Sequence, residues 1–396
     1  MPARRWAQSG CGYTARVYRY AFLFAVAALC AAPPAHFAPH PLAGNLKGGY
    51  QVVAADVNHD GKPDLIAVEQ GSPELAWYEN PSWERHVIAG NLPRMVNLGA
   101  WDTDGDGVPE LVLASEFSMQ ARKSLGVISV LKHGGDPRRP WTVTEIDRLP
   151  TSHRIRWADI DGSGKKVAVN APLTGAAAEP PDYRGHTPLV FYRPPEWKRE
   201  LIGEENEGVV HGICVTDWDG DGREEILTAS FAGLHLYKLG KDGRWTRTQL
   251  AAGSPLPWPR SGSSDVAVGR LGKRRFLAAI EPWHGSEVVI YTPHGKAWLR
   301  TPVDGSFIDG HTVVTGDLNG DGLDEVVAGY RGQGRSVYIY AAADAKGARW
   351  LRTPLDEGGM GAAACVIEDL NGDRRPDIAC IDSQSLKWYE NRGPGR

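Results

Sequence analysis

A short acidic segment recurs along the whole length of this chain. In the copy from Asp317 to Glu325, carboxylate or amide side chains stand at the first, third and fifth positions, glycine at the sixth and an acid at the ninth. Oxygen ligands at this spacing suit Ca²⁺, which takes about 6–8 oxygens, and the glycine permits the sharp turn that points them inward. An EF-hand loop places its closing acid at the twelfth position and lies between helices. These segments are flanked by short apolar runs instead, so we expect them to join strands.

Five copies of the loop are complete and two are degenerate. We expect structural Ca²⁺ in the complete copies, with side-chain ligands from Asp56, Asn58, Asp60 and Asp64; Asp102, Asp104, Asp106 and Glu110; Asp217, Asp219, Asp221 and Glu225; Asp317, Asn319, Asp321 and Glu325; and Asp369, Asn371, Asp373 and Asp377. The copy at Asp159 has Val167 in the closing position, and the copy near Gly269 keeps only the turn.

The repeat, of roughly 50 residues, indicates a propeller. Apolar runs flank each acidic loop, a third run ends in an aromatic pair such as Trp77-Tyr78, and a tryptophan such as Trp83 opens a fourth. Four short antiparallel strands per repeat are typical of a propeller blade. The sequence therefore predicts an all-β, seven-bladed β-propeller of four-stranded antiparallel blades, forming one domain over residues 36–396. Residues 37–44 align with the fourth strand of the first repeat, so we expect this N-terminal strand to complete the last blade and close the ring.

The first 35 residues have the composition of a signal peptide, with arginines before a 12-residue apolar core at 21–32. A signal peptide directs export, so we expect a periplasmic or secreted protein. The apolar core is too short to span a membrane. A net charge of −4 without a basic stripe argues against a nucleic-acid partner, and we expect a monomer. Cys214, Cys365 and Cys380 are expected to be buried small hydrophobic residues, with a Cys365–Cys380 disulfide as the alternative.

A second pattern lies six residues before the first aspartate of the loops. His153, His211 and His311 share this position, and Tyr50 occupies it in the first repeat. At about 3.3 Å per residue along an innermost strand, these side chains fall roughly 20 Å from the calcium loops, at the opposite mouth of the ring. We interpret the three histidines as catalytic. The alternatives are histidines that cap their strands separately, or a divalent metal on the axis held by three histidines, as in catalytic zinc sites.

The loops between second and third strands end at the same mouth and add further candidates. The catalytic candidates are His153, Arg154, His211, His284, His311, Tyr330 and Arg331, and the substrate-binding candidates are Tyr50, Glu281, Trp283, Tyr183 and Arg184. Tyr183 and Arg184 belong to an insert at 172–188 that is long enough to form a lid. No nucleophile elbow, phosphate-binding loop or dinucleotide motif is present. Histidine, tyrosine and arginine without a nucleophile suit proton abstraction beside a carbonyl or carboxylate, that is, β-elimination.

The acidic loops resemble the FG-GAP/VCBS repeats of calcium-dressed propellers such as the integrin head, over nearly all of residues 36–396. Three stretches, at 152–159, 280–285 and 310–312, resemble the propeller part of aldos-2-ulose dehydratase and are similar to seven-bladed lyases that cleave rhamnose–glucuronate linkages. The resemblance implies elimination across a carbon–oxygen bond of a sugar. The dehydratase family also carries cupin domains, which this sequence lacks, so its isomerising step is not implied here. We therefore expect an exported carbon–oxygen lyase, either a keto-sugar dehydratase or a uronate glycan lyase; the alternative is a non-catalytic propeller that binds carbohydrate or protein.

Overall fold

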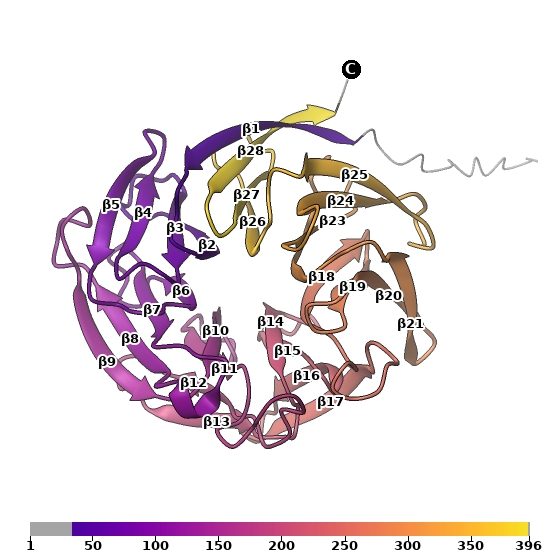
Figure 1. Ribbon diagram of the computed structural model, residues 1–396, viewed down its shortest axis with the longest axis horizontal. Helices are drawn as coiled ribbons and strands as arrows, with labels where there is room; N and C mark the ends of the chain where they lie inside the picture. Colours follow the sequence, from indigo (N-terminus) through magenta and orange to yellow (C-terminus); the bar gives the residue numbers. More distant parts are fainter. Residues whose placement is uncertain (1–33, 395–396) are drawn as a thin grey trace, which may run out of the picture.

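The computed structural model describes residues 34–394, and these form seven four-stranded antiparallel sheets arranged around a ring (Figure 1). The predicted seven-bladed, all-β propeller is confirmed. A single turn of 3-10 helix, η1 (Ala121–Lys123), is the helical element of the described residues. None of their helices has the length and apolarity needed to cross a membrane. The predicted signal peptide lies almost entirely outside the described residues.

Each sheet has one strand beside the ring axis and three strands that follow it outward. The innermost strands are β2 (Gly49–Ala55), β6 (Asn97–Trp101), β10 (Ser152–Ala158), β14 (Val210–Thr216), β18 (Asp265–Leu271), β22 (Gly310–Gly316) and β26 (Ala364–Glu368). The second strands are β3 (Asp64–Glu69), β7 (Glu110–Ser115), β11 (Val167–Pro172), β15 (Glu225–Ser230), β19 (Arg274–Glu281), β23 (Glu325–Tyr330) and β27 (Asp377–Ile381). We number the blades one to seven in this order.

The outer half of each blade is built in the same way. The third strands are β4 (Leu75–Glu79), β8 (Val127–Lys132), β12 (Leu189–Tyr192), β16 (Gly233–Leu239), β20 (Glu287–His294), β24 (Ser336–Ala342) and β28 (Leu386–Pro394). The outermost strands are β5 (Glu84–Ala89), β9 (Thr142–Arg148), β13 (Arg199–Gly203), β17 (Trp245–Ala251), β21 (Ala297–Asp304), β25 (Trp350–Glu357) and β1 (Ala35–Ala43). The strand β1 pairs antiparallel with β28, so blade seven combines strands from both ends of the described chain.

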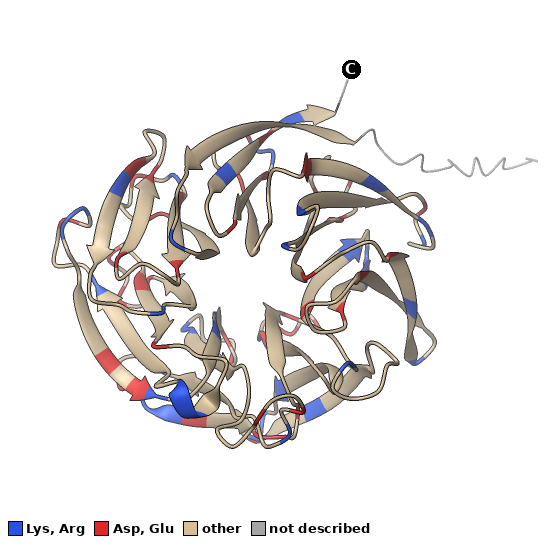
Figure 2. Cartoon of the chain, viewed as in Figure 1, with Lys and Arg blue, Asp and Glu red and all other residues tan. Residues whose placement is uncertain are grey.

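The hydrophobic core lies between neighbouring blades rather than inside one. Every residue of β3 is buried, because both faces of this second strand are covered by the sheets on either side. Trp77 and Ile66 of blade one pack with Leu111 of blade two, and Leu65 of blade one packs with Leu386 of blade seven. Lys, Arg, Asp and Glu are interspersed around the ring (Figure 2).

The cysteines depart from the expectation. Cys365 and Cys380 face each other across β26 and β27, with Cα atoms 4.1 Å apart, and form a disulfide, whereas Cys214 is free. The expectation that all three are unpaired was therefore wrong for this pair. The reason is register: the two residues are direct cross-strand partners, which places their side chains within bonding reach.

The acidic loops connect the innermost and second strands, and each complete loop folds around its first and last acids. In blade six, Asp317 accepts hydrogen bonds from the backbone N–H groups of Gly320, Asp321 and Gly322, and buried Glu325 accepts one from Leu318. Burial raises the pKa of Glu325 to about 8. The neighbouring carboxylates and buried Glu325 make this loop a candidate cation site, and Ca²⁺ in the loop stays a prediction.

In two of the loops a lysine from the third strand of the same blade reaches the acids. The Nζ atom of Lys132 lies 2.9 Å from a carboxylate oxygen of Glu110 and also contacts Asp104. Lys238 Nζ likewise lies 2.9 Å from Glu225. The loops of blades two and four therefore contain an ammonium group supplied by the protein itself.

Replacing Asp321 by alanine should destabilise the fold by about 1–3 kcal/mol, because a loop built around several carboxylates loses one of its cation-binding groups. The effect should appear as a lower melting temperature in calcium-containing buffer. Asp242→Ala, on the exposed turn between β16 and β17, is the matched control. An unchanged melting temperature for Asp321→Ala with calcium present would show that this loop does not depend on a cation.

Candidate active site

Four side chains that share one register converge at one mouth of the ring. Tyr50, His153, His211 and His311 each lie at an irregularity in the pairing of an innermost strand with its second strand. An extra residue at such a bulge bends the strand and re-aims its side chain. The ring centroid of His211 lies 5.0 Å from that of His153 and 4.9 Å from that of His311. The ring centroid of Tyr50 lies 5.2 Å from that of His311. The structure thus brings together the residues that the sequence spacing singled out.

Backbone carbonyls of neighbouring blades fix the orientation of two of these histidines. His211 Nδ1 lies 3.2 Å from the carbonyl oxygen of Ser264, and His311 Nδ1 lies 2.6 Å from that of Ala363. The Ser264 hydroxyl also lies 3.2 Å from His211 Nδ1 and can accept as well as donate. Because a carbonyl oxygen can only accept, we place the proton on each Nδ1, which leaves a lone pair on each Nε2. The Nε2 atom of His311 is buried and has no hydrogen-bond partner among residues 34–394.

A fourth histidine, His284, enters from the loop between β19 and β20. His284 adopts a left-handed φ of 48°. Its Nδ1 lies 2.9 Å from Asp309 and 3.2 Å from Arg331, and Arg331 itself pairs with Asp309 at 3.0 Å. A guanidinium can only donate, so the acceptor for the Nδ1–H of His284 is the carboxylate of Asp309. With the proton on Nδ1, Nε2 carries a lone pair. That Nε2 lies 3.3 Å from Nε2 of His211.

Three imidazole lone pairs therefore face one another, and the ligand atoms of His211, His284 and His311 all lie within 4.8 Å of each other. Lone pairs that face one another repel. Burial lowers the pKa of all three histidines, so protonation of a ring would relieve this repulsion only at an unfavourable cost in free energy. Two nitrogens bound to zinc at about 2.0–2.1 Å in a tetrahedral site are about 3.3–3.4 Å apart. Each ring also donates its other N–H to a carbonyl or carboxylate, as metal-bound histidines do. These three residues can hold a divalent metal, with His284 in the place where the register suggested His153.

His153 instead pairs with Tyr50. Its Nε2 lies 2.8 Å from Tyr50 Oη and 3.0 Å from Nη1 of Arg154, whose guanidinium carbon is 5.6 Å from the centre of the Tyr50 ring. Burial, and then the charge of Arg154, lower the pKa of His153 well below its usual value. The ring is therefore neutral near pH 7, and its Nε2 is a hydrogen-bond acceptor at this contact.

Two cavities at the mouth meet at the histidines. One, of about 270 Å³, is lined by Tyr50, His153, His211 and Arg331 among others, and the second, of about 470 Å³, extends past Asp309. Trp283 and His284 line both cavities.

The insert of blade three, residues 172–188, packs against Trp283, which lines both cavities. The ring of Tyr183 makes an edge contact with Trp283 at a centroid distance of 5.7 Å, and Arg184 lies over Trp258 at 4.7 Å. The aromatic residues beside the cavities can stack on the faces of sugar rings.

Two candidates are placed away from the cavities. Glu281 is buried at the end of β19, where Ser263, Tyr291 and Arg300 donate hydrogen bonds to it. The hydroxyl of Tyr330 donates to the carbonyl of Gly334. Neither lines a mouth cavity. Asp309 faces the mouth but was not identified from the sequence. Its position two residues before His311 could have indicated it.

Comparisons with known proteins agree with the predicted resemblance. Residues 125–294 match the family described as "Aldos-2-ulose dehydratase, beta-propeller domain", residues 56–113 match the FG-GAP-like repeat and residues 310–341 match the FG-GAP repeat. The chain is 26% identical over 308 residues to the aldos-2-ulose dehydratase of Phanerodontia chrysosporium, a match that covers 68% of this chain and 33% of that protein. It thus spans about a third of the length of that relative.

Solved structures share the fold at low sequence identity. Crystal structures of BBS1N in complex with ARL6DN, soaked with mercury or with lead, align with TM-scores of 0.57 and 0.56. They are 14% and 15% identical and cover 91% and 92% of this chain, and 98% and 99% of their own chains. The chain is therefore similar in sequence to FG-GAP repeats and to the aldos-2-ulose dehydratase propeller, and similar in fold to a chain of the BBS1N–ARL6DN structures.

Acid should destabilise the fold through the buried histidines. An unfolded histidine has a pKa of about 6.5, whereas burial holds the folded-state pKa of His153, His211 and His311 well below it. The folded protein binds fewer protons than the unfolded chain, so this stability is fully present above about pH 6.5 and is lost as the pH falls below that value.

Urea unfolding of the wild type and of His311→Asn, at a series of pH values from 8 to 5, measures this effect. The variant should lose stability less steeply with acid, and His294→Asn, at an exposed histidine, should follow the wild type. Parallel acid profiles for the wild type and His311→Asn would contradict the assignment of a neutral buried ring.

Proposed function

We propose that this protein is an exported carbon–oxygen lyase that carries out β-elimination on a sugar at the histidine-lined mouth. The observation that carries the proposal is the joint placement of two units: three imidazole lone pairs that converge, and a Tyr50–His153 pair at 2.8 Å beside them. The similarity to the aldos-2-ulose dehydratase propeller supports a sugar as the substrate. Dehydration of a keto-sugar and cleavage of a uronate glycan are both eliminations of this kind.

The residues of the chain can divide the reaction between them. Tyr50 and His153 form a relay that removes the proton on the carbon next to a carbonyl or carboxylate. The electron pair of that C–H bond forms the new C=C bond, and the neighbouring C–O bond breaks. Arg331, held by Asp309, faces the mouth cavity and can stabilise negative charge on the substrate oxygen. The departing oxygen takes a proton and leaves as water or as the hydroxyl of a sugar fragment.

His211, His284 and His311 would hold a divalent metal, which when bound supplies a Lewis acid that polarises an oxygen of the substrate. We propose a separate, structural role for Ca²⁺ in the acidic loops, which lie at the other end of the innermost strands. The Cys365–Cys380 disulfide supports export, since such bonds persist in oxidising compartments.

The test is to incubate the protein with acidic glycans and with 1,5-anhydrofructose and to follow the ultraviolet absorbance of a new conjugated double bond. His211→Ala and His311→Ala should each lower turnover about 10²–10⁴-fold, and His294→Ala, on the exposed end of β20, should leave it unchanged. No product from any of these substrates, or full activity in the His211→Ala/His311→Ala double variant, would favour a non-catalytic propeller that binds carbohydrate or protein.

Tyr50→Phe separates proton transfer from metal binding. The variant keeps the ring and the three metal-binding histidines but loses the hydroxyl that contacts His153, so kcat should fall about 10²-fold or more while bound metal is unchanged. Tyr78→Phe, on the third strand of the same blade, is the control. Wild-type kcat in Tyr50→Phe would remove the relay from the mechanism.

A further inference from the structure

A third cavity lies along the ring axis and is distinct from those at the mouth. It has a volume of about 460 Å³ and extends from Tyr50 and His311 along the innermost strands as far as Thr315 and Lys166, toward the acidic loops. It shares only Tyr50 with the mouth cavity that contains His153 and His211. Tyr50 and His311, which the proposed elimination uses, close the cavity at the mouth, and the rest of its lining has no part in that reaction.

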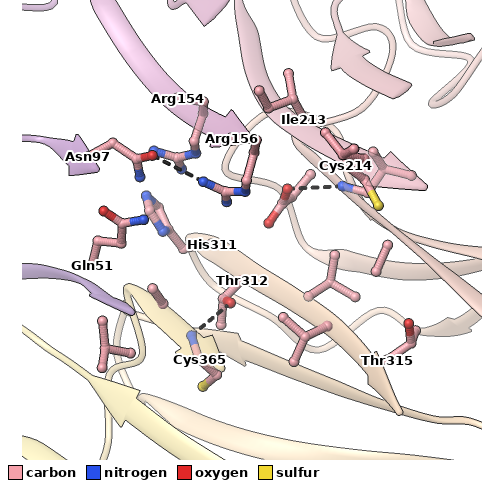
Figure 3. A pocket seen from close by; sticks show the side chains of 18 of the residues that line it. Gln51, Asn97, Arg154, Arg156, Ile213, Cys214, His311, Thr312, Thr315 and Cys365 are labelled. Carbon is pink, nitrogen blue, oxygen red and sulfur yellow. Dashed lines mark hydrogen bonds between the residues drawn. The ribbon is translucent and has the colours of Figure 1, made fainter. Parts of the chain in front are cut away.

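Two arginines of β10 point into this cavity (Figure 3). Arg156 donates from Nη1 to the side-chain oxygen of Asn97 at 3.1 Å and to the carbonyl of Ile155 at 2.8 Å. Arg154 is 6% exposed, and its hydrogen bonds among the described residues go to His153 alone. Most of the N–H groups of the two guanidinium groups are therefore available to a ligand.

The charges around the cavity do not balance. Within residues 34–394 neither arginine forms an ion pair with a carboxylate. Lys166 is paired with Glu224 at 3.1 Å, which leaves Asp265 as the remaining acid of the lining, acting on both arginines at longer range. Two positive charges against one negative charge leave a surplus of one positive charge in a confined space.

Burial makes this surplus positive charge unfavourable in free energy. Burial, and then the nearby charge of Arg154, lower the pKa of Arg156, while burial raises the pKa of Asp265 to about 6. A buried charge without a partner destabilises a fold, so a counter-ion in the cavity would stabilise this one.

We propose that the axial cavity binds a small oxyanion between Arg154 and Arg156. A guanidinium presents a planar fork of donors that matches the oxygens of a carboxylate, a sulfate or a phosphate. The volume suits an inorganic oxyanion or a small organic acid rather than a glycan chain. Because Arg154 also lies 3.0 Å from Nε2 of His153, the bound anion holds the arginine that orients the proton-transfer pair. Arg154 is in this sense a positioning residue, and its ligand reaches the active site from behind.

Isothermal titration calorimetry of the full chain with sodium sulfate and with sodium acetate, at an ionic strength held constant with sodium chloride, tests the proposal. At least one of the two anions should bind saturably, and the tighter one tells whether the site favours a tetrahedral oxyanion or a carboxylate. Arg156→Gln should weaken binding about 10- to 100-fold, the usual effect of losing a charged hydrogen-bond donor. Arg148→Gln, whose partner is the exposed Glu145, should bind as the wild type does.

Asp265→Asn gives a second arm in case Arg156→Gln does not fold. Removing the opposing negative charge should tighten binding several-fold, a gain that damage to the fold cannot produce. The proposal is overturned if neither anion binds the wild type saturably, if Arg156→Gln binds as tightly as the wild type, or if Asp265→Asn binds the anion no more tightly. All of these outcomes are measured as anion binding and not as turnover, so the failure of this proposal and the failure of the proposed elimination can be told apart.

Discussion

The candidate active site depends on hydrogen bonds that pass from one blade to the next. His211 of blade four donates to the carbonyl of Ser264 before the innermost strand of blade five, and His311 of blade six donates to that of Ala363 before the innermost strand of blade seven. Strands β18 and β26 pair with their second strands without a bulge, whereas β14 and β22 carry one at the histidine. For His211 and His311, a bulged blade thus supplies the side chain and the next, regular blade supplies the carbonyl that sets where the Nε2 lone pair points.

Much of this arrangement could be predicted from the sequence, because both main signals are periodic. The recurring acidic loop gave the number of blades, and a fixed offset from it brought His153, His211 and His311 to one mouth. Contacts that break the repeat could not be predicted. His284 enters from a loop of irregular backbone and joins the trio in place of His153, and Glu281, only three residues away, turns into the core because β19 continues through it. The Cys365–Cys380 disulfide depends on a cross-strand register that spacing alone leaves open.

The two ends of the innermost strands meet different electrostatic demands. At one end, acids are gathered in loops where Ca²⁺ is proposed to bind, and in two of these loops Lys132 and Lys238 also contact the acids. At the other end, neutral imidazole rings and two arginines are gathered, and we propose that they bind a metal and an anion. The lysines lie on third strands, about 20–30 residues after the first loop aspartate, so the loop motif by itself does not reveal them. The acidic loops and the proposed active site therefore lie at opposite ends of the innermost strands.

The central claim is that the convergent lone pairs of His211, His284 and His311 form a metal site beside a proton-transfer pair. X-ray absorption spectroscopy at the zinc edge, on protein reconstituted with one equivalent of zinc in the presence of excess calcium, measures this directly. We expect about three imidazole nitrogens at roughly 2.0–2.1 Å in the wild type, and the loss of one of them in His284→Ala. A metal bound through oxygen ligands alone, or a spectrum that is the same in His284→Ala, would contradict the account.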